Sequence, residues 1–173
     1  KLGNPAPTAP LYLLKAPNSF LAHGETIRKP ASYDGKVVYE GEIGIVIGKR
    51  ATAVSEADAP NYIFGYTVIN DVTAAEIINA DKTFAQWVRA KSYDTFGVFG
   101  PVVETDVDPM SLSIKTILDG DERQNYPVND CFYSPAKLVS LISQDLTLEP
   151  GDVIAIGTSV GVGSMKPGSE VSV

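Results

Sequence analysis

Hydrophobic and polar positions alternate most clearly in one stretch in the first third of the chain, from Tyr39 to Ile47. Side chains alternate across a β-strand, so the isoleucines of this stretch fall on one face, and Glu40 and Glu42 share the other. Two like charges side by side on a strand face repel each other, and a divalent cation between them would turn that repulsion into binding. The pattern predicts a strand whose acidic face is either a solvated surface, which is common for such pairs, or half of a metal site.

Alternating and apolar runs predict several further short strands. Residues 63–69 alternate cleanly, and residues 112–118 alternate before Asp119-Gly120, a turn that predicts a hairpin with residues 122–127. The remaining predicted strands cover residues 11–14, 98–104 and 153–156, and the last of these is expected to be buried.

Short helices are predicted where a capping residue precedes a helical pattern. Thr73 with Glu76 three residues later forms a capping box for residues 74–80. Ser134-Pro135 has the N-cap and first-turn pattern of a helix that ends near residue 143. Two shorter helical segments are expected at residues 55–59 and 83–90. Many short strands with a few short helices predict a single α+β domain, mainly β.

Composition narrows the functional classes. The 173 residues carry a net charge of −7 with no basic run, which argues against a surface for nucleic acid or for an anionic membrane. No apolar run approaches the roughly 20 residues that a membrane-spanning helix needs. Cys131 is the only cysteine, so no intrachain disulfide can form, which fits a reducing compartment such as the cytoplasm.

The two ends of the sequence indicate a portion of a longer chain. The sequence begins at Lys1 without an initiator methionine, and residues 170–173 read as the beginning of a strand. We therefore expect residues 1–173 to be a single domain that lacks a preceding segment and one or more final strands.

Asp71, just beyond the predicted strand at 63–69, is the candidate for a third metal ligand. An acid that follows Asn70 and precedes a capped helix is often part of an Asx-turn, and that alternative stays open. As a third carboxylate, it suits an octahedral Mg²⁺ or Mn²⁺ with positions left for water and substrate. Such a cation is most useful to a substrate with adjacent oxygens, such as an α-keto acid or a 1,3-diketone, because it stabilises the enolate that forms.

The other candidate residues each have a plain alternative. Lys91 is either a surface lysine or a partner for the acids or for a substrate carboxylate. Residues 157–163 are glycine-rich, so their N–H groups and the Thr158 hydroxyl can face an anion, or the stretch is an ordinary loop; it matches neither the Rossmann nor the P-loop pattern. His23, the only histidine, is expected in a turn, and Cys131 is expected to be packed rather than nucleophilic.

Taken together and in order, the motifs of this chain resemble the fumarylacetoacetate hydrolase family. The resemblance runs from about Pro10 to the last residue, and the order and spacing of the motifs make it more specific than any single motif. The motifs are YEGEIGIVIGK at 39–49, GYTVINDV at 65–72, QW at 86–87, KSYDTF at 91–96, GP at 100–101, LEPGDVIAIGT at 148–158 and GVG at 161–163.

The resemblance implies a β-roll with a few short helices, a homodimer and a bound Mg²⁺, Mn²⁺ or Ca²⁺. Members of the family cleave, decarboxylate, hydrate or isomerise small β-diketo or α-keto acids, often in the catabolism of aromatic compounds. By position, the resemblance implies Glu40, Glu42 and Asp71 as metal ligands, Lys91 as the catalytic lysine, and Thr158, Gly157 and Gln124 as substrate-binding residues.

The sequence departs from the family pattern in two places. Ala75 and Ile78 stand where many members have an arginine and a glutamine that contact substrate, and the His-x-x-Glu pair of the family's lid segment is not within these residues. The expected reaction is hydrolytic or decarboxylating C–C cleavage of acylpyruvate, fumarylpyruvate or oxaloacetate type. Isomerisation or hydration of 2-oxo-dienoic acids, and a catalytically degenerate metal-binding member, remain as alternatives.

Overall fold

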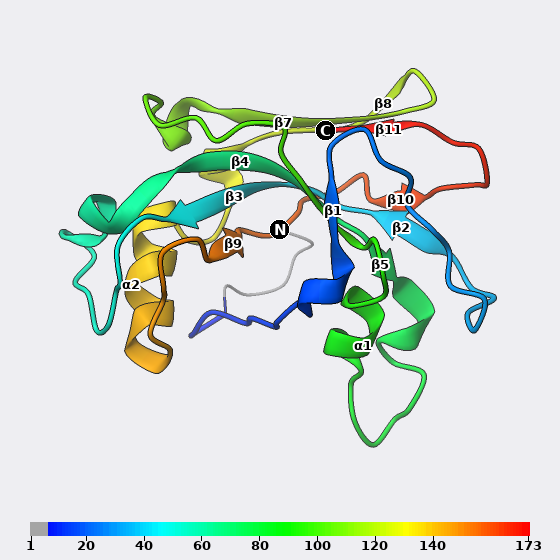
Figure 1. The fold of residues 1–173 in the computed structure, drawn as a ribbon, viewed down its shortest axis with the longest axis horizontal. Coiled ribbons are helices and arrows are strands. Elements are labelled where there is room, and N and C mark those ends of the chain that lie inside the picture. The colour runs from blue at the N-terminus through cyan, green and yellow to red at the C-terminus, as the bar shows by residue number, and fades with distance from the viewer. Residues whose placement is uncertain (1–6) are drawn as a thin grey trace.

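A five-stranded sheet carries the acidic stretch near its centre. The structure is a computed structural model that describes residues 7–173, so the opening of the sequence at Lys1 lies outside the described residues. The strand order is β1-β6-β4-β3-β9, in which β1 and β6 are parallel and every other neighbouring pair is antiparallel (Figure 1). The strands are β1 (Phe20–Ala22), β3 (Gly41–Ile47), β4 (Ile63–Asp71), β6 (Gly97–Phe99) and β9 (Val153–Ala155).

Two three-stranded sheets flank the large one, with the orders β10-β2-β5 and β11-β7-β8. The predicted hairpin is confirmed as β7 and β8, and it lies across one face of β3 and β4 (Figure 1). The strands of the two flanking sheets are β2 (Val37–Tyr39), β5 (Thr73–Ala74) and β10 (Gly163–Ser164), and β7 (Ser113–Leu118), β8 (Asp121–Pro127) and β11 (Val171–Ser172).

The acidic stretch is two strands rather than the single one predicted, because the chain passes from one sheet to another at Glu40. Tyr39 ends β2 and Gly41 begins β3, and only Glu40 lies between them. Its backbone N–H donates to Asn70 Oδ1 at 3.0 Å instead of joining a regular ladder. The break therefore places the first acid at the junction of two sheets.

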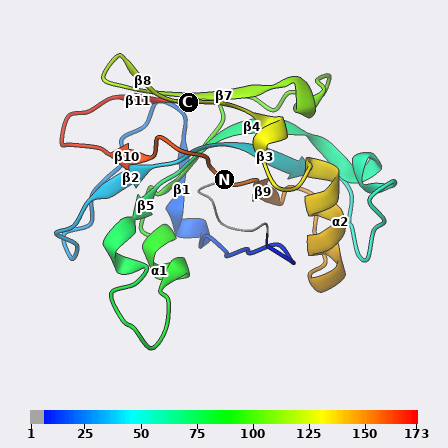
Figure 2. The ribbon, with the colours of Figure 1, turned by 180° about the vertical axis from the view of Figure 1, so that it is seen from behind.

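The isoleucine face of β3 is buried, as the alternation predicts. Ile45 and Ile47 pack against Leu138, Val139 and Ile142 of α2 (Pro135–Asp145), beside the ends of β3 and β9 (Figure 2). Helix α2 begins as predicted, with Ser134 Oγ accepting the Lys137 N–H at 3.2 Å, and it ends two residues beyond the predicted limit. Ile43 packs under the hairpin against Ile114, Tyr126 and Val128.

The capping-box helix predicted at residues 74–80 is wrong. Thr73 belongs to β5, and only a single 3₁₀ turn, η3 (Ala75–Ile77), follows it. The Thr73 hydroxyl donates to Glu40 Oε1 at 3.0 Å, and the Glu76 carboxylate accepts the Tyr33 hydroxyl and the Lys36 N–H. Neither side chain is left to cap a helix, because both are held by distant residues.

Three other predictions are corrected. Residues 11–14 form no strand, and Leu11 and Leu14 are 89% and 66% exposed. The strand at β9 is not buried, because it lies at the edge of its sheet and Val153 is 40% exposed. The predicted strand at 98–104 is limited to β6 plus an isolated bridge between Glu104 and Tyr66.

The remaining helical segments are shorter than predicted. The segment expected at 83–90 is α1 (Trp87–Lys91), and the one expected at 55–59 is a turn that leads into η2 (Ala59–Tyr62). The other 3₁₀ turns are η1 (Pro17–Ser19), η4 (Pro109–Ser111) and η5 (Val128–Asp130). The predicted class, α+β and mainly β, is confirmed.

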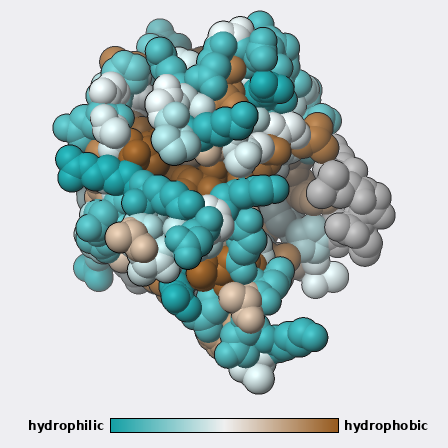
Figure 3. All heavy atoms as spheres, turned by 90° about the vertical axis from the view of Figure 1, so that its right-hand side faces the viewer, coloured by the Kyte–Doolittle hydropathy of each residue, from teal (hydrophilic) through white to brown (hydrophobic). Residues whose placement is uncertain are grey.

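The surface is largely polar on one side of the molecule (Figure 3). On the side shown in Figure 3, hydrophilic side chains cover most of the surface, and smaller hydrophobic areas lie between them. Among residues 7–173, no helix has both the length and the apolar character that crossing a membrane requires.

Candidate metal centre

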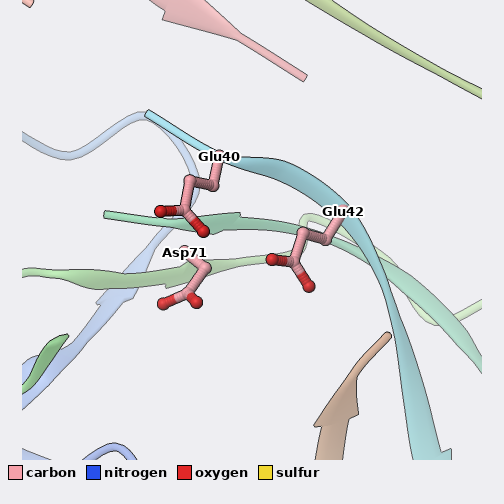
Figure 4. Close-up of side chains that lie close together, drawn as sticks. All are labelled: Glu40, Glu42 and Asp71. Atoms are coloured by element: carbon pink, nitrogen blue, oxygen red, sulfur yellow. The ribbon is translucent and has the colours of Figure 1, made fainter. Parts of the chain in front are cut away.

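Three carboxylates meet where β2, β3 and β4 come together. Glu40, Glu42 and Asp71 each offer an oxygen, and these oxygens all lie within 4.8 Å of one another. Antiparallel pairing explains the meeting. Gly41 is opposite Asn70, so Glu40, which precedes Gly41, lies opposite Asp71, which follows Asn70, and the Asp71 N–H donates to the Glu40 carbonyl at 2.9 Å. Figure 4 shows the three carboxylates converging on one side of the strands. We call this group the three-carboxylate cluster.

Lys91 binds two members of the cluster. Its Nζ donates to Glu40 Oε2 at 2.7 Å and to Asp71 Oδ2 at 2.5 Å, and the side chain is 4% exposed. Burial by itself would lower the pKa of Lys91, but the carboxylates of Asp71 and Glu40 outweigh burial and raise that pKa. The lysine at the end of α1 is therefore held as a cation beside the acids, and it is not on the surface.

Lys15 is a second cation at the cluster, and the sequence analysis missed it. Its Nζ donates to Asp71 Oδ1 at 2.6 Å and to the Val72 carbonyl at 3.3 Å. Burial lowers the pKa of Lys15 in spite of the neighbouring Asp71 carboxylate. The charge count of the predicted site could have indicated a second cation. Three acids with one lysine leave an excess of negative charge, which a buried site has to compensate.

Glu42 is the most buried acid of the cluster, at 3% exposure. Its Oε2 accepts the Gly157 N–H at 2.7 Å. Burial first, and then the charges of Asp71 and Glu40, raise the pKa of Glu42 to about 8. A divalent cation fits here because it would compensate this crowding of negative charge, and three carboxylate oxygens suit Mg²⁺, Mn²⁺ or Ca²⁺.

The raised pKa of Glu42 predicts a pH-dependent response to Mg²⁺. The folded pKa of about 8 lies above the ordinary value of 4.5, so between these values the folded state holds a proton that the unfolded state has released. In metal-free buffer, this group therefore makes the free energy of unfolding fall as the pH rises through that range. A cation must displace the proton, so its apparent affinity should weaken about tenfold per pH unit below the pKa.

We therefore expect Mg²⁺ to raise the melting temperature more at pH 8.5 than at pH 6.0, measured by differential scanning calorimetry. NaCl of equal ionic strength serves as the control for general screening. An equal gain at both pH values would show that no buried proton is displaced.

The glycine-rich loop after β9 reaches the cluster through its backbone. Gly157 and Thr158 both line a groove that leads to the three-carboxylate cluster. The Thr158 hydroxyl donates to the Gly41 carbonyl at 3.0 Å and accepts from Gln124 Nε2 at 2.9 Å. Gln124 is buried under this loop and is not among the residues that line the groove.

A groove of about 1200 Å³ leads to the three-carboxylate cluster. The charged residues that line it are the cluster, Lys15, Lys91, Asp130 and Asp152, and Cys131 lines it as well. His23 is exposed in the turn after β1 and does not line the groove. The apolar part of the lining comes from the segment before β1, from β1, β4, β6 and β9, and from α2, and it includes Leu13, Phe20, Ile69, Phe99, Leu138, Ile142, Val153 and Ile156.

The family comparison covers the whole chain. The family described as "Fumarylacetoacetate (FAA) hydrolase C-terminal" matches residues 1–173. The chain belongs to the fumarylacetoacetate hydrolase family. The resemblance seen in the sequence motifs is therefore confirmed. Ala75 and Ile78, which replace the family's arginine and glutamine, are half-buried and do not line the groove.

Relatives with named activities cover different reactions. Oxaloacetate tautomerase YisK of Bacillus subtilis is 36% identical over 91% of this chain and 52% of its own length. The 4-hydroxyphenylacetate degradation bifunctional isomerase/decarboxylase of Salmonella dublin is 38% identical over 95% of this chain and 38% of its own length. The crystal structure of 5-carboxymethyl-2-hydroxymuconate delta-isomerase from Mycobacterium smegmatis is 38% identical and superposes with a TM-score of 0.90 over 98% of this chain and 66% of that one. This chain therefore spans only part of each relative.

Proposed function

We propose that the protein is a divalent-metal-dependent enzyme that cleaves a C–C bond of small β-diketo or α-keto acids, of acylpyruvate, fumarylpyruvate or oxaloacetate type. Hydrolysis and decarboxylation both belong to this proposal, and both pass through an enolate. The observation that carries it is the three-carboxylate cluster, with the buried Lys91 and the half-buried Lys15, at a large groove.

The carboxylates and the two lysines have separate roles in the groove. Glu40, Glu42 and Asp71 would hold the cation, which would supply Lewis-acid stabilisation of negative charge on the substrate oxygens. Lys91, held as a cation, orients Glu40 and Asp71 and can donate to a substrate carboxylate. Lys15 donates to Asp71 at 2.6 Å and lines the groove, so it can hold that carboxylate in place and donate to a substrate oxygen.

Isomerisation or tautomerisation is the second candidate. It needs the same enolate but only proton transfer, and no water has to be activated. It is favoured by the names of the relatives from Bacillus subtilis, Salmonella dublin and Mycobacterium smegmatis. Hydration of 2-oxo-dienoic acids in aromatic catabolism, and metal binding without catalysis, are weaker candidates.

Product analysis separates these candidates. Purified protein is incubated with Mg²⁺ and an acylpyruvate, oxaloacetate or a 2-oxo-dienoic acid, and the mixture is followed by ¹H NMR. Cleavage yields pyruvate with a second acid or with carbon dioxide, isomerisation keeps the carbon skeleton intact, and hydration adds a carbinol signal. Turnover that persists after removal of divalent cations would contradict the metal-dependent proposal.

We also propose that the chain acts as a homodimer in the cytoplasm. The homodimer is supported by large apolar side chains that are exposed outside the groove, among them Phe64 and Val68 of β4 and Val102. Light scattering should give about twice the 18.4 kDa chain mass, and a mass of one chain would contradict the dimer.

A further inference from the structure

Gln124 belongs to β8 of the hairpin and is buried on the side of that strand that faces β3. It is on the inward face of β8, opposite Thr116 of β7, and is 2% exposed. Burying an amide costs free energy unless its donors and its acceptor find partners. The partners of this amide therefore indicate what the side chain does.

The amide oxygen binds β3 at the residue between the two glutamates. Gln124 Oε1 accepts the Gly41 N–H at 3.0 Å and the Thr116 hydroxyl at 2.8 Å. The orientation of the amide is fixed, because a backbone N–H can only donate and so the oxygen must face Gly41. A side chain at residue 41 would overlap Thr116 Oγ1, which shows how closely β3 approaches this bond.

The amide nitrogen binds the loop after β9. Gln124 Nε2 donates to Thr158 Oγ1 at 2.9 Å and to the Ser159 carbonyl at 3.2 Å. The same loop delivers the Gly157 N–H to Glu42 at 2.7 Å. One side chain therefore joins Gly41, the residue between two candidate ligands, to the loop that donates to one of them.

The loop also packs directly against the backbone of β8. Gly161 has φ +95°, and a Cβ there would overlap the Arg123 carbonyl oxygen and lie 3.1 Å from Gln124 Cγ. Only glycine fits this close contact. The position of the loop is therefore set by its contact with β8 at Gln124.

The structure assigns Gln124 a positioning role: its amide locks residues 157–160 onto β3 and thereby keeps the Gly157 N–H on Glu42 and the Thr158 hydroxyl at the groove. Gln124 itself touches neither the groove nor the three carboxylates. This role rests on the proposed function, because what it positions are a proposed metal ligand and a proposed substrate contact. Without the amide, residues 157–160 are no longer held against β3. Glu42 then loses its N–H donor, and Gly157 and Thr158 are no longer held in place at the groove.

The variant Gln124→Met tests this role, because methionine has similar length but makes no comparable hydrogen bonds. We expect Mn²⁺ affinity, measured by electron paramagnetic resonance, to fall at least about tenfold, as for other residues that orient metal ligands. We also expect the KM for the substrate that the product analysis identifies to rise by a larger factor than kcat falls. The matched control is Thr116→Val, which removes a buried hydroxyl from the same amide oxygen but has no contact with the loop, and it should keep wild-type Mn²⁺ affinity and KM. Wild-type Mn²⁺ affinity and KM in Gln124→Met would overturn the positioning role.

If Gln124→Met does not fold, Gly161→Ala decides the question. Its Cβ pushes the loop away from β8 while Gln124 stays intact, so Mn²⁺ affinity should fall by a similar factor, and an unchanged affinity would overturn the role. Failure of the proposed function has a different signature, because the wild-type protein itself then binds no Mn²⁺ and the positioning role falls with it.

Discussion

Replacing Asp71 by asparagine should abolish both divalent-cation binding and turnover. Asp71 contributes one of the three carboxylates. It accepts hydrogen bonds from both lysines, from Lys91 at 2.5 Å and from Lys15 at 2.6 Å. The neutral amide keeps the shape but leaves the buried Lys91 and the half-buried Lys15 facing one fewer negative charge, which should lower the free energy of unfolding by roughly 3 kcal/mol. Isothermal titration with Mg²⁺, a turnover assay and a urea titration measure the three effects.

The control for this variant is Asp121→Asn, which removes an acid of the same kind from an exposed position. Among residues 7–173, Asp121 forms an ion pair only with the exposed Arg123 of its own strand, at 3.1 Å, and such surface pairs contribute little. It should leave binding, turnover and stability unchanged. Mg²⁺ binding of wild-type strength in Asp71→Asn would refute the assignment of Asp71 as a ligand.

Replacing Lys91 by methionine should separate turnover from cation binding. The ammonium group lies 2.7 Å from Glu40 and 2.5 Å from Asp71, so it repels a cation bound by the same acids. Without it, we expect Mn²⁺ to bind at least as tightly as in the wild type. Turnover should fall about 10²- to 10³-fold, because a positioned charge that acts on the substrate is lost.

The variant Arg89→Met provides the comparison for Lys91→Met. Arg89 is in the same short helix, α1, but its side chain is exposed, so its loss should change neither property. If Lys91→Met loses Mn²⁺ affinity in proportion to its turnover, the lysine only holds the acids in place and takes no part in the chemistry.

Alternation along the chain was enough to predict part of this centre. It placed Glu40 and Glu42 on one face and the isoleucines on the other, because the period of a strand is two. It also placed Asp71 at the end of a strand, and antiparallel pairing with β3 then brings the residue next to Glu40. The pairing itself is a contact between distant residues, and only the family resemblance pointed to it.

Long-range contacts explain what the sequence analysis missed. Lys15 is in a segment without a regular strand partner, so no local period marks its contact with Asp71. The capping pattern at Thr73 and Glu76 is overridden because Glu40 and Tyr33, far away in the chain, bind those side chains. Gln124 was expected at the substrate, yet the structure places its amide behind the loop because the inward face of β8 points to β3.

The central claim is that Glu40, Glu42 and Asp71 hold a cation that stabilises an enolate, and this step is common to cleavage, decarboxylation and isomerisation. It is tested most directly by following the C3 protons of a 2-oxo acid in D₂O by ¹H NMR. We expect wild-type protein with Mg²⁺ to exchange these protons for deuterium faster than Mg²⁺ alone does, and we expect the acceleration to disappear with EDTA and with Asp71→Asn. Exchange at the rate of Mg²⁺ alone, or equal acceleration by Asp71→Asn, would contradict the claim.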